Sequence, residues 1–292
     1  MDSTFTPLEE IAPKVAAARA AFVAGSTRPA AWRISTLKRV RELLVEREEQ
    51  LLDALAADLG KPRFEAWTTE IGFTISEINH TLAHLGSWMR PDRVSTPIAF
   101  KPGTSRIVAE PKGVACVIAP WNYPVQLLLL PMLAAISAGN AVVGKPSELA
   151  PETAGELVSL IEAIGDPAVA VVHGGVAEAT ELLAQRFDHI LYTGNSNVAR
   201  IVMRAAAEHL TPVTLELGGK SPAIVSRHAK VDVAGRRIAW GKFLNAGQTC
   251  IAPDYALVPA ARVDAFVDAM REAVGALYPD PLRGDDYTSI VD

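Results

Sequence analysis

Two short segments in the second half of the sequence carry residue types suited to covalent catalysis. Cys250 follows a Gly-Gln-Thr turn, in a polar setting where a thiolate can be exposed and stabilised. Glu216 stands between two leucines and precedes two glycines, and a carboxylate in such an apolar setting suits a general base. The other cysteine, Cys116, lies within an apolar run and is interpreted as a small core residue. The sequence therefore predicts Cys250 as a nucleophile and Glu216 as a base.

Three more segments combine polar side chains with the ends of predicted strands. In the first, the Asn122 amide stands close to two prolines at the start of a helix. In the second, Lys145 precedes Glu148 by three residues. In the third, residues 192–196, a glycine and small polar residues open a helix N-terminus that can face a phosphate. Ligands bind beyond the carboxyl ends of parallel strands, so these segments predict one shared binding site.

Apolar periodicity predicts the elements that position these segments. The first ninety residues are expected to be helical, with amphipathic helices over Ala30–Leu59 and Glu65–Trp88. The runs Val94–Phe100 and Ser105–Glu110 then predict a β-hairpin that turns at residues 101–103.

From residue 114 onward, apolar strands alternate with amphipathic helices. Strands are expected at Val114–Ala119, Ala141–Lys145, Ala168–Val172 and His189–Tyr192, and helices at Val125–Ala138, Pro151–Ile164, about Glu178–Ala184 and Val198–Ala207. This alternation is typical of a doubly wound, parallel α/β sheet of the Rossmann-like kind.

A second set of elements follows Pro212. Its strands are expected near Val213–Leu217, Ala223–Val225 and Tyr255–Val258, and its helices near Val231–Leu244 and Ala261–Ala276. A second unit is therefore expected to begin at Pro212.

Composition and charge exclude several classes of protein. The chain has 292 residues, 49% of them hydrophobic, which is enough for about two domains with buried cores and excludes disorder. Its formal net charge is −5, so there is no basic surplus to neutralise phosphates, and nucleic acid is not an expected partner. Two cysteines without a CxxC spacing indicate neither a disulfide framework nor a zinc ribbon. The cytoplasm is the expected location.

Two other features are interpreted as ordinary parts of a globular fold. The apolar run Leu127–Ala138 is too short to cross a bilayer and is expected to be a buried helix, and the polar N-terminus lacks the pattern of an export signal. His80 and His84 stand one helical turn apart, but no third ligand stands beside them. An ordinary helix surface is therefore expected there, with no metal site.

Five motifs, taken in order, resemble the aldehyde dehydrogenase superfamily. They are Pro-Trp-Asn-Tyr-Pro, Gly-Lys-Pro-Ser-Glu, Thr-Gly-Asn, Leu-Glu-Leu-Gly-Gly-Lys-Ser-Pro and Gly-Gln-Thr-Cys. Residues 210–222, 236–243 and 247–255 are most similar to the class 3 or fatty-aldehyde branch. The resemblance covers essentially the whole chain, and this combination of motifs is very specific. It implies a dinucleotide-binding domain of residues 1–90 and 111–211, a bridging β-hairpin of residues 91–110, and an incomplete α/β catalytic domain of residues 212–292.

The resemblance implies oxidation of an aldehyde to a carboxylic acid with NAD, or NADP, as cofactor, and a homodimer at full length. Cys250 would form the thiohemiacetal and the thioester, and the Asn122 amide with the Cys250 N–H would stabilise the oxyanion. Glu216 would activate the water that hydrolyses the thioester. Lys145 and Glu148 would hold the adenosine ribose, and Thr193 to Ser196 would face the pyrophosphate. The residues implied in cofactor binding are Trp121, Lys145, Ser147, Glu148, Thr193, Gly194, Asn195, Ser196, Leu217 and Gly218.

Two departures from the family pattern leave alternatives open. Ala199 occupies a position where a glycine is usual, and the sequence ends at Asp292, before a Glu-x-Phe-Gly-Pro motif and the strand that joins subunits. The chain is therefore expected to be truncated and inactive by itself. One alternative is a remnant that at most binds nucleotide or a partner protein. Another is a cysteine hydrolase, although Cys250 lacks a papain-like context and only the distant His209 or His228 could be its partner.

Overall fold

The computed structural model describes residues 5–280 and 286–291, beginning with a helical region. Its helices are α1 (Leu8–Val23), α2 (Ala30–Glu46), α3 (Glu48–Leu59), α4 (Arg63–Ala66) and α5 (Gly72–Trp88), with a π-helical turn η1 at Trp67–Ile71. The single helix expected over Ala30–Leu59 is two helices, because Arg47 adopts φ −110° and ψ 18° and interrupts the helical backbone. Gly60 ends α3 at φ 57°, a left-handed conformation that glycine adopts without steric penalty.

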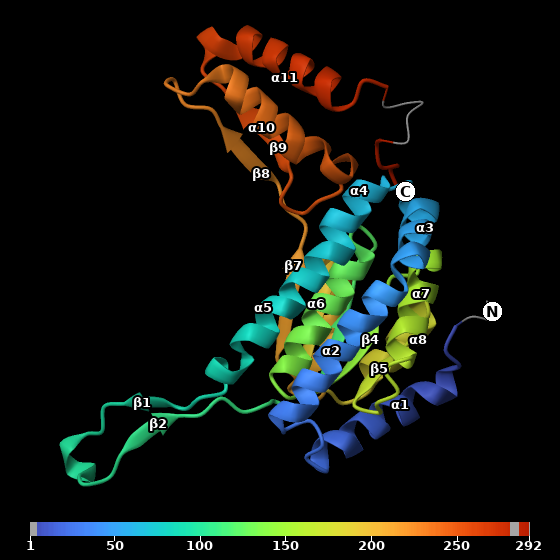
Figure 1. The fold of residues 1–292 in the computed structure, drawn as a ribbon, viewed down its shortest axis with the longest axis vertical. Helices are drawn as coiled ribbons and strands as arrows, with labels where there is room; N and C mark the ends of the chain where they lie inside the picture. Colours follow the sequence, from blue (N-terminus) through green and yellow to red (C-terminus); the bar gives the residue numbers. More distant parts are fainter. Residues whose placement is uncertain (1–4, 281–285, 292) are drawn as a thin grey trace.

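A five-stranded parallel sheet forms the centre of the molecule (Figure 1). Its strands are β3 (Val114–Ile118), β4 (Ala141–Lys145), β5 (Val169–Val171), β6 (His189–Gly194) and β7 (Val213–Leu217), in the order β5-β4-β3-β6-β7. Helices α6 (Pro124–Ser137), α7 (Pro151–Glu162), α8 (Val176–Ala184) and α9 (Ser196–Ala207) connect them. The predicted doubly wound α/β fold is confirmed.

Strand β7 differs from its predicted place. Val213–Leu217, expected from the sequence to begin the second unit, instead pairs in parallel with β6 at the edge of the central sheet. The preceding segment is attached to the same sheet, because the Thr211 hydroxyl donates to the Phe187 carbonyl at 2.9 Å and the Ile190 N–H donates to the Pro212 carbonyl at 3.1 Å. Pro212 therefore lies in the connection from α9 to the edge strand β7 of the same sheet.

Alternate residues of the central strands fill two separate cores. Val117 packs in a cluster with α2, α3, α5, α6 and α7, while Val114, Cys116 and Ile118 pack in a second cluster with α1, α8 and α9. Helices thus cover both faces, which explains why these strands are apolar throughout. Cys116 is fully buried, and burial raises the pKa of its thiol to about 12. It is a core residue, as predicted.

The apolar run Leu127–Ala138 lies almost entirely within α6, which begins at Pro124. Proline suits the first turn of a helix, where its missing N–H leaves no bond unmade. Leu128 and Met132 are buried in the core, so the expected buried helix is confirmed. Within residues 5–280 and 286–291, no helix is long and apolar enough to cross a bilayer.

A β-hairpin projects from one end of the molecule, and residues 221–277 lie at the opposite end (Figure 1). Its strands, β1 (Asp92–Val94) and β2 (Ser105–Ile107), pair antiparallel. The first strand ends at Val94 rather than at Phe100 as expected, and Ile98–Phe100 forms a 3₁₀ turn, η2. Pro97 stands directly before that turn, and its lack of an N–H to donate explains the early end of the strand.

The C-terminal elements form a smaller layer beyond one end of the central sheet (Figure 1). Strands β8 (Ser221–Ile224) and β9 (Pro253–Leu257) pair in parallel, and α10 (Val231–Phe243) packs on α11 (Val263–Leu277). Residues 286–291 return to the helical region, where the Ser289 N–H donates to the Leu59 carbonyl at 2.7 Å. The end of the described chain is thus attached to α3.

Candidate active site

The cysteine segment follows α10 in a tight turn. Asn245 and Ala246 both adopt φ 53°, and Gly247 adopts φ 77°. A Cβ at Gly247 would also lie 2.9 Å from the Lys242 carbonyl oxygen, so both backbone conformation and space favour glycine there. The turn leaves Cys250 as a free, exposed thiol. The accessible loop position predicted for Cys250 is confirmed, whereas its catalytic role stays a prediction.

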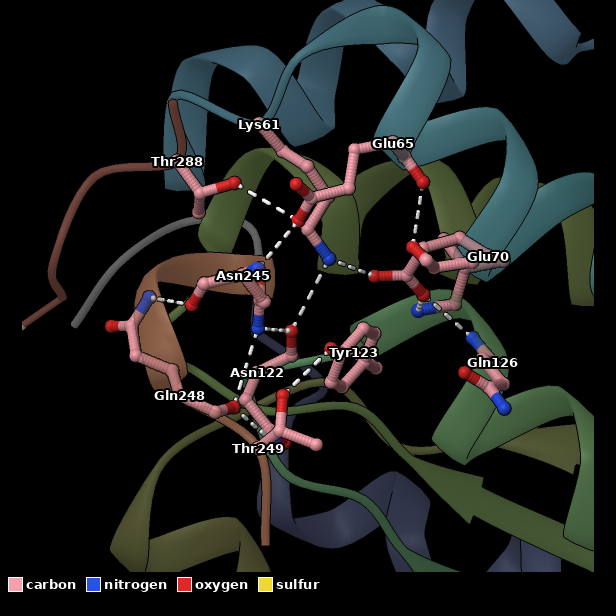
Figure 2. A network of polar contacts seen from close by, with 12 residues as sticks. Lys61, Glu65, Glu70, Asn122, Tyr123, Gln126, Asn245, Gln248, Thr249 and Thr288 are labelled. Atoms are coloured by element: carbon pink, nitrogen blue, oxygen red, sulfur yellow. Dashed lines mark hydrogen bonds and ion pairs between the residues drawn. The ribbon is translucent and has the colours of Figure 1, made fainter. Parts of the chain in front are cut away.

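The segment after β3 is hydrogen-bonded to the cysteine segment (Figure 2). The Asn122 side-chain amide donates to the Gln248 carbonyl at 2.8 Å, and the Asn122 carbonyl accepts from the Asn245 side-chain amide at 2.9 Å. The Tyr123 hydroxyl oxygen lies 2.7 Å from the Thr249 hydroxyl oxygen. Two segments that are far apart in the sequence therefore meet, and the predicted amide donor points at the cysteine segment.

Glu216 occupies a different environment from the one predicted. Leu215 and Leu217 pack against the core, while Glu216 itself is exposed. Alternate side chains of a strand point to opposite faces, so the flanking leucines place this carboxylate away from the core and open to water. The chain that follows approaches the cysteine, because a Cβ at Gly219 would lie 2.5 Å from the Cys250 carbonyl oxygen. The segments that contain Glu216 and Cys250 are therefore in contact.

The segment after β4 contains an ion pair. The almost fully buried Lys145 ammonium donates to the Glu148 carboxylate at 2.8 Å and to the Pro146 carbonyl at 3.1 Å. Burial opposes ionisation of Glu148, but the hydrogen bond and charge of Lys145 outweigh it and lower the pKa of the Glu148 carboxyl group. The buried Ser147 hydroxyl accepts from the Leu149 N–H at 3.3 Å. Glu148 is thus a carboxylate at neutral pH, able to accept from ligand hydroxyl groups.

The segment after β6 caps α9 with its own side chain. The Asn195 side-chain oxygen accepts from the N–H groups of Asn197 and Val198, each at 3.0 Å, which satisfies two of the free donors at the helix start. The Tyr192 hydroxyl accepts from the Asn195 N–H at 3.0 Å. Ala199 is buried in the core, so the methyl group that distinguishes it from glycine is accommodated there.

All these segments lie along one edge of the sheet. Trp121 and Asn122 follow β3, Ser147 and Glu148 follow β4, Asn195 and Ser196 follow β6, and Gly218 follows β7. Strands β4, β3, β6 and β7 are neighbours and parallel, so their carboxyl ends meet. The chain passes from β3 to β4 on one side and reaches β6 on the other, which makes this the kind of switch point where open α/β sheets bind nucleotides. The residues present fit a dinucleotide cofactor.

The model of the aldehyde dehydrogenase family matches residues 6–289. This chain belongs to the aldehyde dehydrogenase family. The dimeric NADP-preferring aldehyde dehydrogenase of Canis lupus familiaris is 43% identical to it over 97% of this chain and 63% of that protein. Aldehyde dehydrogenase family 3 member A2 of Pongo abelii is 44% identical over 94% of this chain and 57% of that protein. The predicted similarity to the class 3 branch is confirmed.

One solved structure is also very similar to this chain. The substrate-bound state of Staphylococcus aureus AldH superposes with a TM-score of 0.93 and 40% sequence identity, covering 96% of this chain and 62% of that chain. The chain therefore spans about 60% of the length of these relatives, whose matched portions range from 57% to 63%.

His80 and His84 form part of an aromatic stack on α5. Their ring centres are 4.2 Å apart, and the Trp88 ring stacks on His84 at 5.7 Å. Among residues 5–280 and 286–291, no group of three His, Cys, Asp or Glu residues could hold a metal ion. His80, His84 and Trp88 are all exposed, so this stack lies on the surface of α5.

Sequence patterns missed the buried charged residues beneath the Asn122 and Cys250 segments. Lys61 is 1% exposed, Glu65 8% and Glu70 0%. The burial of Glu70 could have been found from the sequence. Glu70 precedes Thr74 and Ile78 at spacings of four residues, which places all three on the side of a helix that faces the core. A carboxylate in such a position requires buried partners.

Proposed function

We propose that this protein is an NAD(P)-dependent aldehyde dehydrogenase that oxidises an aldehyde to a carboxylic acid. The observation that carries the proposal is the hydrogen-bonded junction between Asn122 and Gln248, beside an exposed Cys250 thiol. The segments suited to nucleotide binding follow neighbouring strands of the same sheet. A nucleophile, an amide donor and a nucleotide site are the groups that aldehyde oxidation requires.

The side chains of this protein would act in the following order. The Cys250 sulfur bonds to the aldehyde carbon, and the oxygen becomes an oxyanion that accepts from the Asn122 amide and the Cys250 N–H. The Asn122 amide nitrogen carries two N–H groups, and one of them already donates to the Gln248 carbonyl. A bound nicotinamide cofactor would supply the hydride acceptor for this oxidation. Glu216, which is exposed on β7, takes a proton from water as the water oxygen attacks the thioester, and the acid leaves Cys250.

The adenosine ribose of the cofactor is proposed to lie at Glu148, and the pyrophosphate at Thr193 to Ser196. The Glu148 carboxylate would accept from the ribose hydroxyls, and Lys145 holds that carboxylate at 2.8 Å. A 2′-phosphate would bring negative charge toward Glu148, so we propose a preference for NAD over NADP. The named preference of the canine relative for NADP makes both cofactors necessary in any assay. A cytoplasmic location and a homodimer stay predictions.

Aldehyde-dependent formation of reduced NAD or NADP by the product of the complete gene tests this proposal. We expect turnover that Cys250→Ala removes and that Cys116→Ala, the matched change of the buried cysteine, leaves in place. Nucleotide binding without turnover by the complete product would favour the non-catalytic alternative, and absence of both would contradict both proposals.

A further inference from the structure

A lysine that is inaccessible to solvent lies beneath the two segments proposed to be catalytic. Lys61, between α3 and α4, is 1% exposed, and its ammonium donates to the Glu70 carboxylate at 2.6 Å (Figure 2). The same ammonium lies 3.3 Å from the Asn122 carbonyl oxygen and 4.3 Å from the centre of the Tyr123 ring. A buried charge is costly unless it is paired and hydrogen-bonded. Lys61 therefore contacts both consecutive residues of the amide segment as well as its counter-charge.

Glu70 attaches this pair to the helix that follows the amide segment. Its second oxygen accepts from the Val125 N–H at 3.1 Å and from the Gln126 N–H at 2.9 Å, at the start of α6. Burial raises the pKa of Glu70, while the Lys61 ammonium and these two N–H groups oppose the rise. All three partners are donors, so only the ionised carboxylate satisfies each of them. The ion pair thus contacts the chain on both sides of Tyr123.

Glu65 makes the corresponding contacts with the cysteine segment. One of its oxygens accepts from the Asn245 N–H at 2.8 Å and from the Thr288 hydroxyl at 3.1 Å. The Asn245 side-chain amide donates to the Asn122 carbonyl at 2.9 Å, the same oxygen that the Lys61 ammonium approaches. The Asn122 carbonyl oxygen therefore contacts both the Lys61 ammonium and the Asn245 side chain, which belongs to the cysteine segment.

We propose that the Lys61–Glu70 pair is a positioning device that fixes the Asn122 segment against the cysteine segment. The pair fixes the Asn122 carbonyl, and Asn245 and Tyr123 extend that constraint to the turn before Cys250. Its catalytic consequence rests on the proposed function, whereas its effect on the two segments can be measured without turnover. Loss of the pair would widen the range of positions of the Asn122 amide, which lowers kcat more than nucleotide affinity.

The test uses a double variant, Lys61→Met with Glu70→Gln. Lys61→Met alone would leave the Glu70 carboxylate buried without its counter-charge. Glu70→Gln removes that charge and keeps an oxygen for the two N–H groups of α6. Arg63→Met is the matched control, because it removes a nearby cation whose partners, Glu49 and Asp53, are exposed. The variants and the parent protein are compared by thermal melting, amide hydrogen exchange and steady-state kinetics.

We expect the double variant to melt cooperatively and to exchange the amides of residues 121–126 and 244–250 about tenfold faster, with the central strands unchanged. Its kcat should fall about tenfold while KM for the nucleotide is unchanged. Arg63→Met should match the parent protein in every measurement.

Unchanged exchange in the two segments would overturn the proposal, whether or not the protein oxidises aldehydes. Where turnover is present, an unchanged kcat or equal losses of kcat and nucleotide affinity would also overturn it. Failure of the double variant to fold would also overturn the proposal, because the Lys61–Glu70 pair would then stabilise the whole domain rather than two segments. Absence of turnover in the parent protein would count against the proposed function alone.

Discussion

The central sheet and the C-terminal layer differ in how completely their apolar strands are covered. In the sheet, Val143 of β4 is 0% exposed and Ile190 of β6 is 2% exposed. In the C-terminal layer, Ile224 of β8 is 76% exposed and Leu257 of β9 is 52% exposed. The proposed nucleotide segments therefore follow strands with a closed core, whereas the proposed nucleophile belongs to a layer with little core of its own.

The difference shows that polar contacts, more than apolar burial, hold the cysteine segment in place. Asn122 and Glu65, both from the first half of the chain, bond to this segment. The Gln248 side chain adds two more contacts, because it donates to the Ser289 carbonyl and accepts from the Val291 N–H, each at 2.9 Å. Directional contacts fix a unique geometry where burial alone would not. The position of Cys250 thus depends on residues outside its own layer.

The largest expected effect is a loss of turnover without a loss of nucleotide binding. Cys250→Ala removes the sulfur that bonds to the substrate, so aldehyde oxidation by the complete gene product should fall to the limit of detection. Nucleotide affinity, measured by calorimetric titration, should change by less than about twofold, because Cys250 lies in the C-terminal layer and the nucleotide segments follow strands of the central sheet. Retention of substantial turnover would remove Cys250 from its proposed role.

The next effect compares the two regions by stability, with the same substitution in a strand of each. Ile190→Ala should lower the free energy of unfolding by about 2–5 kcal/mol, because it leaves a cavity in a closed core. Ile224→Ala should change it by no more than about 0.5 kcal/mol, because that side chain already contacts water. Urea unfolding of the two variants measures both values. Equal losses would mean that the face of β8 is covered in solution.

The two cysteines give a third comparison, through pH. The pKa of Cys116 is raised from its ordinary value of 9.0 to about 12 by burial. The unfolded chain releases this proton at lower pH than the folded chain, so stability should fall as pH rises from 9.0 toward about 12. In the folded protein, iodoacetamide should modify Cys250 and spare Cys116 in this range, as read by peptide mass spectrometry. Equal modification of both would show that the core opens more readily than its burial implies.

The smallest effect concerns the nucleotide segments alone. Glu148→Gln removes the charge that would oppose a 2′-phosphate, so the ratio of kcat/KM for NADP to that for NAD should rise by about three- to tenfold, or about 1 kcal/mol. Glu152→Gln, an exposed carboxylate at the start of α7, is the matched control and should leave the ratio unchanged. If Glu148→Gln also leaves it unchanged, the Glu148 carboxylate does not face the ribose.

The sequence predicted well those features that depend on neighbouring residues. The alternation of strands and helices, and the polar segments at strand ends, arise from local periodicity and could be located before the structure. The pairing of β7 with β6 and the contact of Lys61 with Asn122 depend on residues distant in sequence, which no local pattern encodes. The exposure of Glu216 follows from the two-residue period of a strand, because Leu215 and Leu217 point to the opposite face. The expected apolar setting instead treats the two leucines as the surroundings of the carboxylate.

The most direct test of the central claim identifies the atom that carries the substrate. Glu216→Gln cannot take a proton from water, so the thioester should persist after one burst of reduced cofactor. Mass spectrometry of proteolytic peptides from the complete gene product should then find the acyl group on Cys250 and none on Cys116. Steady turnover without an adduct, or an adduct on any other residue, would contradict the assignment of Cys250 as nucleophile and Glu216 as base.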